Sequence, residues 1–453
     1  MKSIIKILND HIAIILPSVV FLIIAIVYSY VKIGFSGDFE KNFYLAITGN
    51  TIWQGSDYSG YSPLLSRYFP LMLSHLSVSI SILLGLTNIK YLLTLFAFIV
   101  FFSHVIFLII IYLNFPKEKK DIFTLILLSF LISFFYLQYF ILTESFLAGL
   151  FIWIVFVIYF YVDFDKLSIF NSICLIIFSI FLISSYPSVV LFIPILLFFG
   201  ITKYFKTKNI KKSSNIILFF SFIVLTFAFV FNIYWILSPK SYLGSANFSL
   251  QMFKDLNFIV FMLSVLVILF FSLFKDIKKY KKIFITFTII FSLAIGYILL
   301  QIPPKLGHLY RALSFGIPFL FTLILICIAV FKINLEFIYI KIVNSVLIFW
   351  LLIGSLVYAK NINAHNLEII DYMTNNQTIA IQKFQRKDTR YKFEIYYAIL
   401  ISPTFIKTNN NCKLLISLQD QHNSMLMEYI GKKNFKLKKI GIDVDKLVEI
   451  QQQ

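Results

Sequence analysis

The chain has 453 residues, of which 60% are hydrophobic and only 13% are charged, and its mean hydropathy is +0.88. A water-soluble domain cannot bury that much apolar surface, so the composition excludes an ordinary soluble globular protein. The net charge of +19 would indicate nucleic-acid binding in a soluble protein, but here the lysines lie mainly in short loops between apolar runs, a pattern typical of membrane topology. The sequence therefore predicts an all-α polytopic membrane protein whose partner is the lipid bilayer and not a nucleic acid.

The chain opens with Lys2 and Lys6, followed by the apolar run Ile12–Val31. This start resembles a signal peptide, but its apolar part is too long and it lacks a small-x-small cleavage site. We therefore expect an uncleaved first span. The three cysteines are far apart and imply neither a metal site nor a disulfide framework: Cys174, Cys327 and Cys412.

The stretch Gly34–Leu86 follows the first span and concentrates carboxylates, aromatics and turn residues. Gly34 and Gly37 permit an irregular backbone just outside the membrane, next to Asp38 and Glu40. A carboxylate in this place could act as a general base towards an incoming hydroxyl, or it could hold a divalent metal through oxygen ligands. The alternative is a solvated loop carboxylate, or an ion pair with a neighbouring lysine.

The second half of that stretch, Tyr61–Leu86, is long enough to span a membrane but is rich in serine. Arg67, Ser74, Ser77 and Ser81 recur at spacings of seven, three and four residues, which places them on one face of a helix. Two prolines interrupt its start. We expect an amphipathic helix that lies at the interface or re-enters the membrane without crossing it.

Ten further apolar runs follow, which gives about eleven spans by length. A proline at position 187 predicts the turn between two short runs. The runs are Tyr91–Leu113, Ile122–Leu137, Ser145–Val162, Ile169–Ile183, Ser188–Ile201, Asn215–Ile236, Phe258–Phe274, Ile283–Leu300, Leu313–Phe331 and Ile338–Tyr358.

The positive-inside rule tests this topology, because lysine-rich loops favour the cytoplasm. The N-terminus and the basic loops fall on one side only if Tyr61–Leu86 does not cross. The opposite side then holds the Asp38 loop, Glu144, the segment Pro303–Arg311 and the C-terminal tail. The cytoplasmic loops would be Lys117–Lys120, Lys203–Lys208, Lys211–Lys212 and Lys275–Lys282.

The tail, residues 359–453, has a different character from the membrane part, residues 1–358. Asn361–Gln385 has a helical spacing of apolar residues, whereas Phe393–Phe405 and Lys413–Leu418 read as strands. We expect a small C-terminal α/β domain on the extracytoplasmic side.

The charged residues predicted on the outer side form two groups. Glu144 lies at the outer end of a membrane hairpin, where an ionisable group either pairs, lines a wet cavity or is exposed at the interface. The cations are Arg67 and, in one short loop with paired prolines, Lys305, His308 and Arg311. Arginine and lysine suit phosphate binding, and contact with lipid headgroups is the alternative.

At this point the order of elements resembles the GT-C fold integral-membrane glycosyltransferases. In that superfamily a first span precedes a long outer loop with interfacial helices, which begins with an acidic residue near the membrane and often carries an aromatic-Pro-Pro-Leu run. Gly37-Asp38-Phe39-Glu40 and Tyr61-Ser62-Pro63-Leu64 resemble these motifs, although Ser62 stands in place of the first proline. Leu142-Thr143-Glu144-Ser145 resembles the acidic turn of the following hairpin, and His308-Leu-Tyr310-Arg311 resembles the lipid-phosphate contact.

The resemblance implies an extracytoplasmic active site in a bacterial inner membrane and a polyprenyl-phosphate-linked sugar as donor. Asp38, Glu40 and Glu144 would be the catalytic residues, and a glycan or lipid-linked glycan would be the acceptor. Arg67, Lys305, Tyr310 and Arg311 would bind substrate and phosphate. No cofactor is implied apart from a divalent metal, which Asp38 could bind. The alternatives are an O-antigen-type polymerase and a lipid-oligosaccharide flippase or transporter.

The topology yields a first prediction. In a background whose native cysteines are replaced, a Gly37→Cys variant should react with a membrane-impermeant maleimide added to intact cells, because Gly37 is expected outside. Blocking by an impermeant reagent before lysis provides the measurement. Reactivity that appears only after the membrane is opened would contradict the topology and, with it, an extracytoplasmic Asp38.

Overall fold

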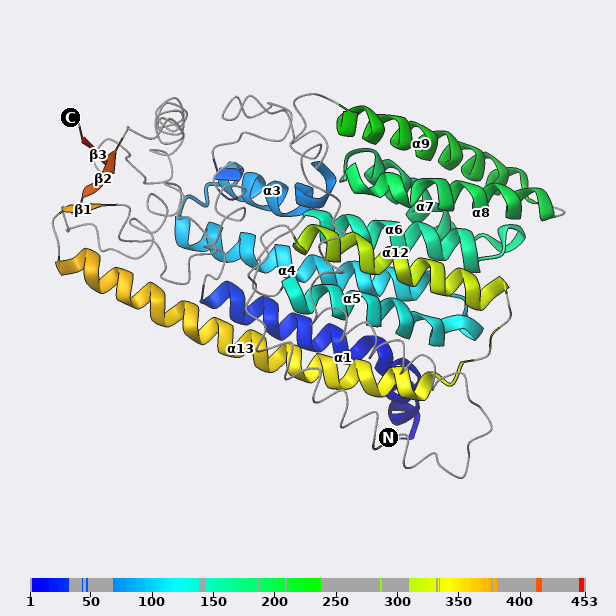
Figure 1. Ribbon diagram of the computed structural model, residues 1–453, viewed down its shortest axis with the longest axis horizontal. Helices are drawn as coiled ribbons and strands as arrows, with labels where there is room; N and C mark the ends of the chain where they lie inside the picture. The colour runs from blue at the N-terminus through cyan, green and yellow to red at the C-terminus, as the bar shows by residue number, and fades with distance from the viewer. Residues whose placement is uncertain are drawn as a thin grey trace. The chain divides into compact units, whose positions relative to one another are not determined.

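The structure is a computed structural model and describes residues 2–31, 43, 46–47, 68–137, 144–185, 187–207, 210–237, 286, 309–330, 333, 335–375, 378–380, 413–417 and 448–451. Most of these residues are helical (Figure 1). The α-helices are α1 (Lys2–Tyr30), α3 (Tyr68–Leu83), α4 (Ile89–Asn114), α5 (Phe123–Leu137), α6 (Glu144–Tyr161), α7 (Ile169–Phe181), α8 (Ile193–Lys206), α9 (Lys212–Leu237), α12 (Leu309–Val330) and α13 (Phe337–Asn375).

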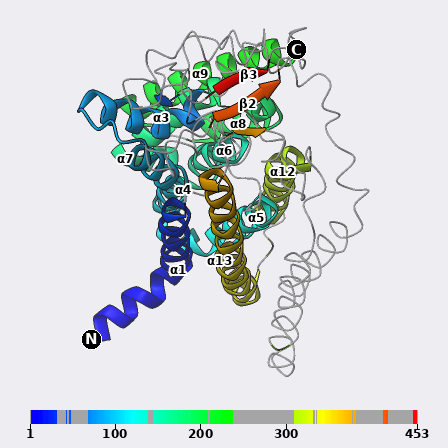
Figure 2. The ribbon, with the colours of Figure 1, turned by 90° about the vertical axis from the view of Figure 1, so that its left-hand side faces the viewer.

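Within the described residues, four 3₁₀ turns connect helices, and three short strands belong to the C-terminal tail. The turns are η3 (Lys117–Ile122), η4 (Phe164–Lys166), η5 (Leu182–Ser184) and η6 (Pro187–Leu191). The strands are β1 (Thr378–Ala380), β2 (Lys413–Ser417) and β3 (Val448–Gln451), which form a parallel sheet in the order β1-β2-β3 (Figure 2). Leu414 pairs with Val448, and Thr378 pairs with Lys413.

Five described segments are long and apolar enough to cross a membrane: His11–Tyr30, Ile89–Asn114, Val189–Lys206, Lys212–Tyr234 and Phe337–Asn361. The chain is therefore a helical membrane protein. Described helices lie at the predicted runs except Phe258–Phe274 and Ile283–Leu300, which lie outside the described residues apart from position 286. The total of about eleven spans stays a prediction.

The tail differs in part from the expected pattern. Helix α13 continues through residues 358 and 359 and ends at Asn375, after which Thr378–Ala380 is a strand. The helical spacing in Asn361–Gln385 therefore predicts a helix that extends too far towards the C-terminus. The strand expected at Lys413–Leu418 corresponds to β2, whereas Phe393–Phe405 lies outside the described residues. The C-terminal α/β domain as a whole stays a prediction.

The chain divides into two compact units. Unit 1 comprises Met1–Leu22, His104–Tyr139 and Thr143–Gly354, and unit 2 comprises Ile23–Ser103, Phe140–Leu142 and Ser355–Gln453. Within unit 1, α12 lies beside α5 and α6, while α9 packs on α7, α8 and the two 3₁₀ turns between them (Figures 1 and 2).

Helix α9 shows how unit 1 faces its surroundings. One side is buried and follows a spacing of three and four residues through Leu218, Ser221, Leu225, Ala228 and Asn232. The opposite side exposes large apolar side chains, as expected of a helix in contact with lipid. These exposed residues are Ile216, Phe219, Phe220, Ile223, Phe227 and Val230.

In unit 2, a glycine follows the end of α3 and an asparagine precedes the start of α4. Gly85 has a φ of 85°, and the N–H groups of Gly85 and Leu86 donate to the carbonyls of Ile82 and Ser81. This is the hydrogen-bond pattern that closes a helix with a left-handed glycine. Asn88 Oδ1 then accepts a 2.9 Å hydrogen bond from the Lys90 N–H, which caps α4.

Gly200 of α8 marks the closest packing point among α6, α8 and α9. A Cβ at this position would lie 2.9 Å from Phe222 Cε1 and 3.2 Å from Tyr159 Cδ2. Those two rings also contact each other, with centroids 5.6 Å apart, and Tyr159 is hydrogen-bonded to Ser221. Only glycine leaves room for this three-helix contact.

We predict that Gly200→Val destabilises the protein by about 1–3 kcal/mol, because the added methyl groups overpack a site that has no free volume. Ile201→Val is the matched control, since Ile201 is the next residue and its side chain is exposed. Thermal unfolding in detergent measures both variants. Equal melting temperatures for the two variants would contradict the packing described here.

Candidate functional site

The structure describes three of the seven predicted site residues, and only by their backbone. Glu144 is the first residue of α6, and Tyr310 and Arg311 lie in the first turn of α12. The predicted functional residues therefore lie at the N-terminal ends of α6 and α12. The other four predicted residues lie outside the described residues: Asp38, Glu40, Arg67 and Lys305.

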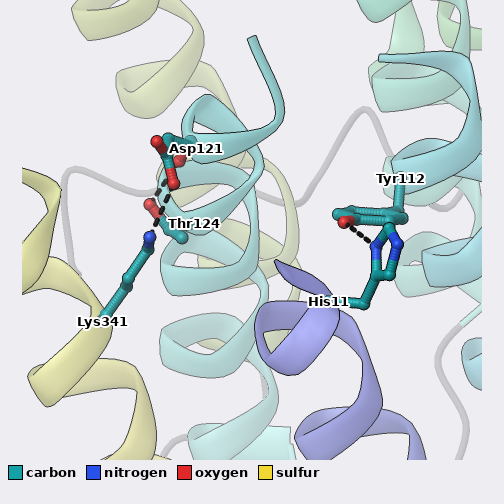
Figure 3. Close-up of polar contacts among 5 residues, drawn as sticks. All are labelled: His11, Tyr112, Asp121, Thr124 and Lys341. Atoms are coloured by element: carbon teal, nitrogen blue, oxygen red, sulfur yellow. Dashed lines mark hydrogen bonds and ion pairs between the residues drawn. The ribbon is translucent and has the colours of Figure 1, made fainter. Parts of the chain in front are cut away.

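Two polar contacts at one end of unit 1 join segments from distant parts of the sequence (Figure 3). His11 Nδ1 of α1 forms a 2.7 Å hydrogen bond with Tyr112 Oη of α4. Nearby on η3, Asp121 Oδ1 accepts a 2.6 Å hydrogen bond from Lys341 Nζ of α13. These contacts place the start of α1, the end of α4 and the start of α13 at the same end of unit 1.

Lysines of η3 and α8 complete this basic end. Lys119 and Lys120 lie over the rings of Tyr161 and Tyr112, at 5.6 and 4.3 Å from the ring centroids. Burial, together with nearby Lys117, holds the pKa of the Lys120 ammonium below its usual value. The segments 117–120 and 203–208 were predicted to share one side, and their described residues do lie at one end. Its assignment to the cytoplasm stays a prediction.

Lys203 ties the end of α6 to the end of α8. Its Nζ donates to the carbonyl of Val162 at 2.8 Å and to that of Phe160 at 3.3 Å, and it lies 5.0 Å from the centroid of Phe164. The last carbonyls of a helix have no partner within that helix. A lysine from a neighbouring helix therefore fixes where α6 ends.

The predicted functional residues of α6 and α12 lie at the opposite end of unit 1. Helix α6 ends at Tyr161, under Lys119, so Glu144 lies about 25 Å from the basic end at 1.5 Å per residue. Helix α12 ends at Val330, a short segment before α13 and its Lys341–Asp121 contact. Since α6 and α12 pack together, Glu144 and Arg311 begin neighbouring helices at one end.

Buried polar groups that the sequence reading did not single out lie inside both units. In unit 1, Asn232 Nδ2 donates to the carbonyls of Ala228, Leu182 and Ile183 at 2.7, 3.1 and 3.3 Å. The signal in the sequence was an asparagine inside the long apolar run Asn215–Ile236. In unit 2, the ring of buried His75 lies 6.0 Å from that of Phe96.

Some of these buried atoms have no hydrogen-bond partner in the part of the chain that the structure describes. They include both ring nitrogens of His75, Asn232 Oδ1 and the hydroxyls of Ser179, Ser184 and Ser185. Within the same described residues, no three His, Cys, Asp or Glu side chains come together as a metal site. The possible metal ligand Asp38 lies outside them.

Comparisons with known proteins identify no relative of this chain. Protein-family models, curated proteins and solved structures were each searched, and none matches the chain.

We predict that Lys203→Met destabilises the protein by about 1–3 kcal/mol, because it leaves carbonyls at the end of α6 without a donor. Lys206→Met is the control: Lys206 lies on the same helix, and its side chain is exposed. Lys203→Arg should retain more stability than Lys203→Met. Thermal unfolding in detergent gives the comparison, and equal losses for Lys203→Met and Lys206→Met would refute the capping role.

Proposed function

We propose that the protein is a membrane glycosyltransferase of the GT-C type. It would move a sugar from a polyprenyl-phosphate donor to a glycan or lipid-linked glycan on the extracytoplasmic face. The observation that carries the proposal is the arrangement of α6 and α12. They pack together, and the residues that resemble the family's acidic turn and lipid-phosphate contact, Glu144 and Arg311, lie in their first turns at the end away from the lysines.

The proposed reaction is a single displacement with inversion. The acceptor hydroxyl attacks the anomeric carbon of the sugar, a new C–O bond forms, and the bond from that carbon to the phosphate oxygen breaks. Asp38 would accept the proton of the hydroxyl as general base, with Glu40 and Glu144 assisting. The polyprenyl phosphate leaves with the bonding electron pair and gains negative charge.

That developing charge is what the cations of the site would stabilise. Arg67, Lys305 and Arg311 would bind the phosphate, and Tyr310 would donate a hydrogen bond from its hydroxyl. Arginine suits the two oxygens of a phosphate because its guanidinium is a planar, two-pronged donor. A divalent metal held by Asp38 would serve the same purpose.

A transporter of lipid-linked oligosaccharides is the second candidate. The observation that favours it is the presence of polar groups inside the helical units, namely His75 and Asn232. Polar groups at such depth often mark a substrate path in transporters. Transfer and transport differ in whether a glycosidic bond forms, and a single assay can separate them.

We predict that Asp38→Asn lowers sugar incorporation roughly 100-fold or more, because an amide cannot accept the proton of the acceptor hydroxyl. The assay expresses the protein in cells fed a radiolabelled hexose. It measures label in polyprenyl-linked sugar and in surface glycan separately. With transfer blocked, label should accumulate in the polyprenyl-linked fraction.

Asp57→Asn is the matched control, because Asp57 lies in the same predicted loop and has no assigned role. Membrane insertion of each variant is checked by its amount in purified membranes. Normal incorporation by Asp38→Asn would eliminate the catalytic assignment. Loss of sugar movement across the membrane with normal bond formation would establish the transporter instead.

A further inference from the structure

A basic corner of unit 1 lies where α4 ends and α7 begins. Asn171 Nδ2, in the first turn of α7, donates a 2.8 Å hydrogen bond to Asn114 Oδ1, the last residue of α4. The lysines of η3 follow Asn114 after two residues. We define the basic corner as Lys117, Lys119 and Lys120; the hydrogen bond brings it close to the start of α7.

Apolar side chains continue from this corner along the outside of unit 1. Leu113, next to Asn114, is 54% exposed. On α7, Ile169 is 81% exposed and Ile173, about one turn further, is 50% exposed. An exposed basic group beside an exposed apolar strip is the arrangement that fits a lipid headgroup and its acyl chain.

Two lysines of the corner, Lys119 and Lys120, are held in place, and none of the three forms an ion pair within the described residues. Lys119 and Lys120 lie over tyrosine rings, which position their ammonium groups. Of the two acids on η3, Asp121 pairs with Lys341, and Glu118 is exposed. Half-buried Lys203 lies close enough to repel Lys119, while Asp163 and Asp165 lie near Lys203 and attract it. An anion placed here would relieve this repulsion between ammonium groups.

We propose that the basic corner binds the headgroup of an anionic phospholipid, whose acyl chain lies along Leu113, Ile169 and Ile173. The lysines would hold the headgroup phosphate as point charges. The apolar strip favours a lipid over free phosphate, because a free anion would gain nothing from it. This inference does not depend on the proposed glycosyl transfer.

The test compares two triple variants with the same change in charge. One replaces the corner: Lys117→Gln, Lys119→Gln and Lys120→Gln. The matched control replaces three other lysines at the end of α8 and the start of α9: Lys206→Gln, Lys211→Gln and Lys212→Gln. Detergent-solubilised protein is titrated with phosphatidylglycerol or phosphatidylcholine, and its melting temperature is followed.

Phosphatidylglycerol should raise the melting temperature of the unmodified protein more than phosphatidylcholine does, because a ligand of the folded state stabilises it. The half-saturating phosphatidylglycerol concentration should rise at least about tenfold in the corner variant and stay unchanged in the control. If the corner variant does not purify as a monodisperse protein, Lys117→Gln and Lys211→Gln are compared in the same way.

Three results would overturn the proposal. Equal weakening in the corner variant and its control would mean that the basic end acts only as a diffuse charged surface. Equal effects of the two lipids would mean that headgroup charge is not recognised. The same rise in melting temperature with inorganic phosphate alone would identify an anion site and not a lipid site.

Discussion

Unit 1 depends on one constraint: a backbone carbonyl that is buried away from water costs free energy unless a donor from the protein pairs with it. Side chains from neighbouring helices supply the missing donors. Lys203 donates to the carbonyls at the end of α6, and Asn232 donates to those of η5, after α7. Asn344 of α13 donates to the Thr124 carbonyl of α5 at 2.8 Å. These bonds link helices where apolar packing alone would leave their register loosely defined, because lipid tails are as apolar as the side chains.

The same contacts give unit 1 two chemically different ends. Lys203, Lys119 and Lys120 lie at the end where α6 finishes, and the ring contacts of Tyr161 and Tyr112 hold two of these ammonium groups in place. The first residues of α6 and α12 lie at the other end. Lysines gathered at one end favour the orientation that places this end in the cytoplasm.

The sequence predicted the helical membrane class and the position of most described helices, because long apolar runs carry that information directly. It also predicted that Lys117–Lys120 and Lys203–Lys208 share one end. It did not predict the contact between Asn171 and Asn114, or the three carbonyls under Asn232, because these depend on which helices become neighbours. Spacing within a segment does not encode that choice. The helical spacing after Asn361 likewise predicted a helix that is too long. The helix ends at Asn375, and the chain then forms β1, whose pairing with β2 the local spacing does not encode.

The polar groups inside unit 1 also bear on where its chemistry can lie. The amide nitrogens of Asn232, Asn344 and Asn171 each donate to another part of the protein, so they stabilise the helices. What stays unpaired among the described atoms there is mostly oxygen, including Asn232 Oδ1 and the hydroxyls of Ser184 and Ser185. A neutral hydroxyl or amide oxygen is not a strong base and brings no positive charge to a phosphate. A reaction of the proposed kind therefore requires carboxylates and cations, and the sequence offers Asp38, Arg67 and Lys305 for these roles in segments outside the described helices.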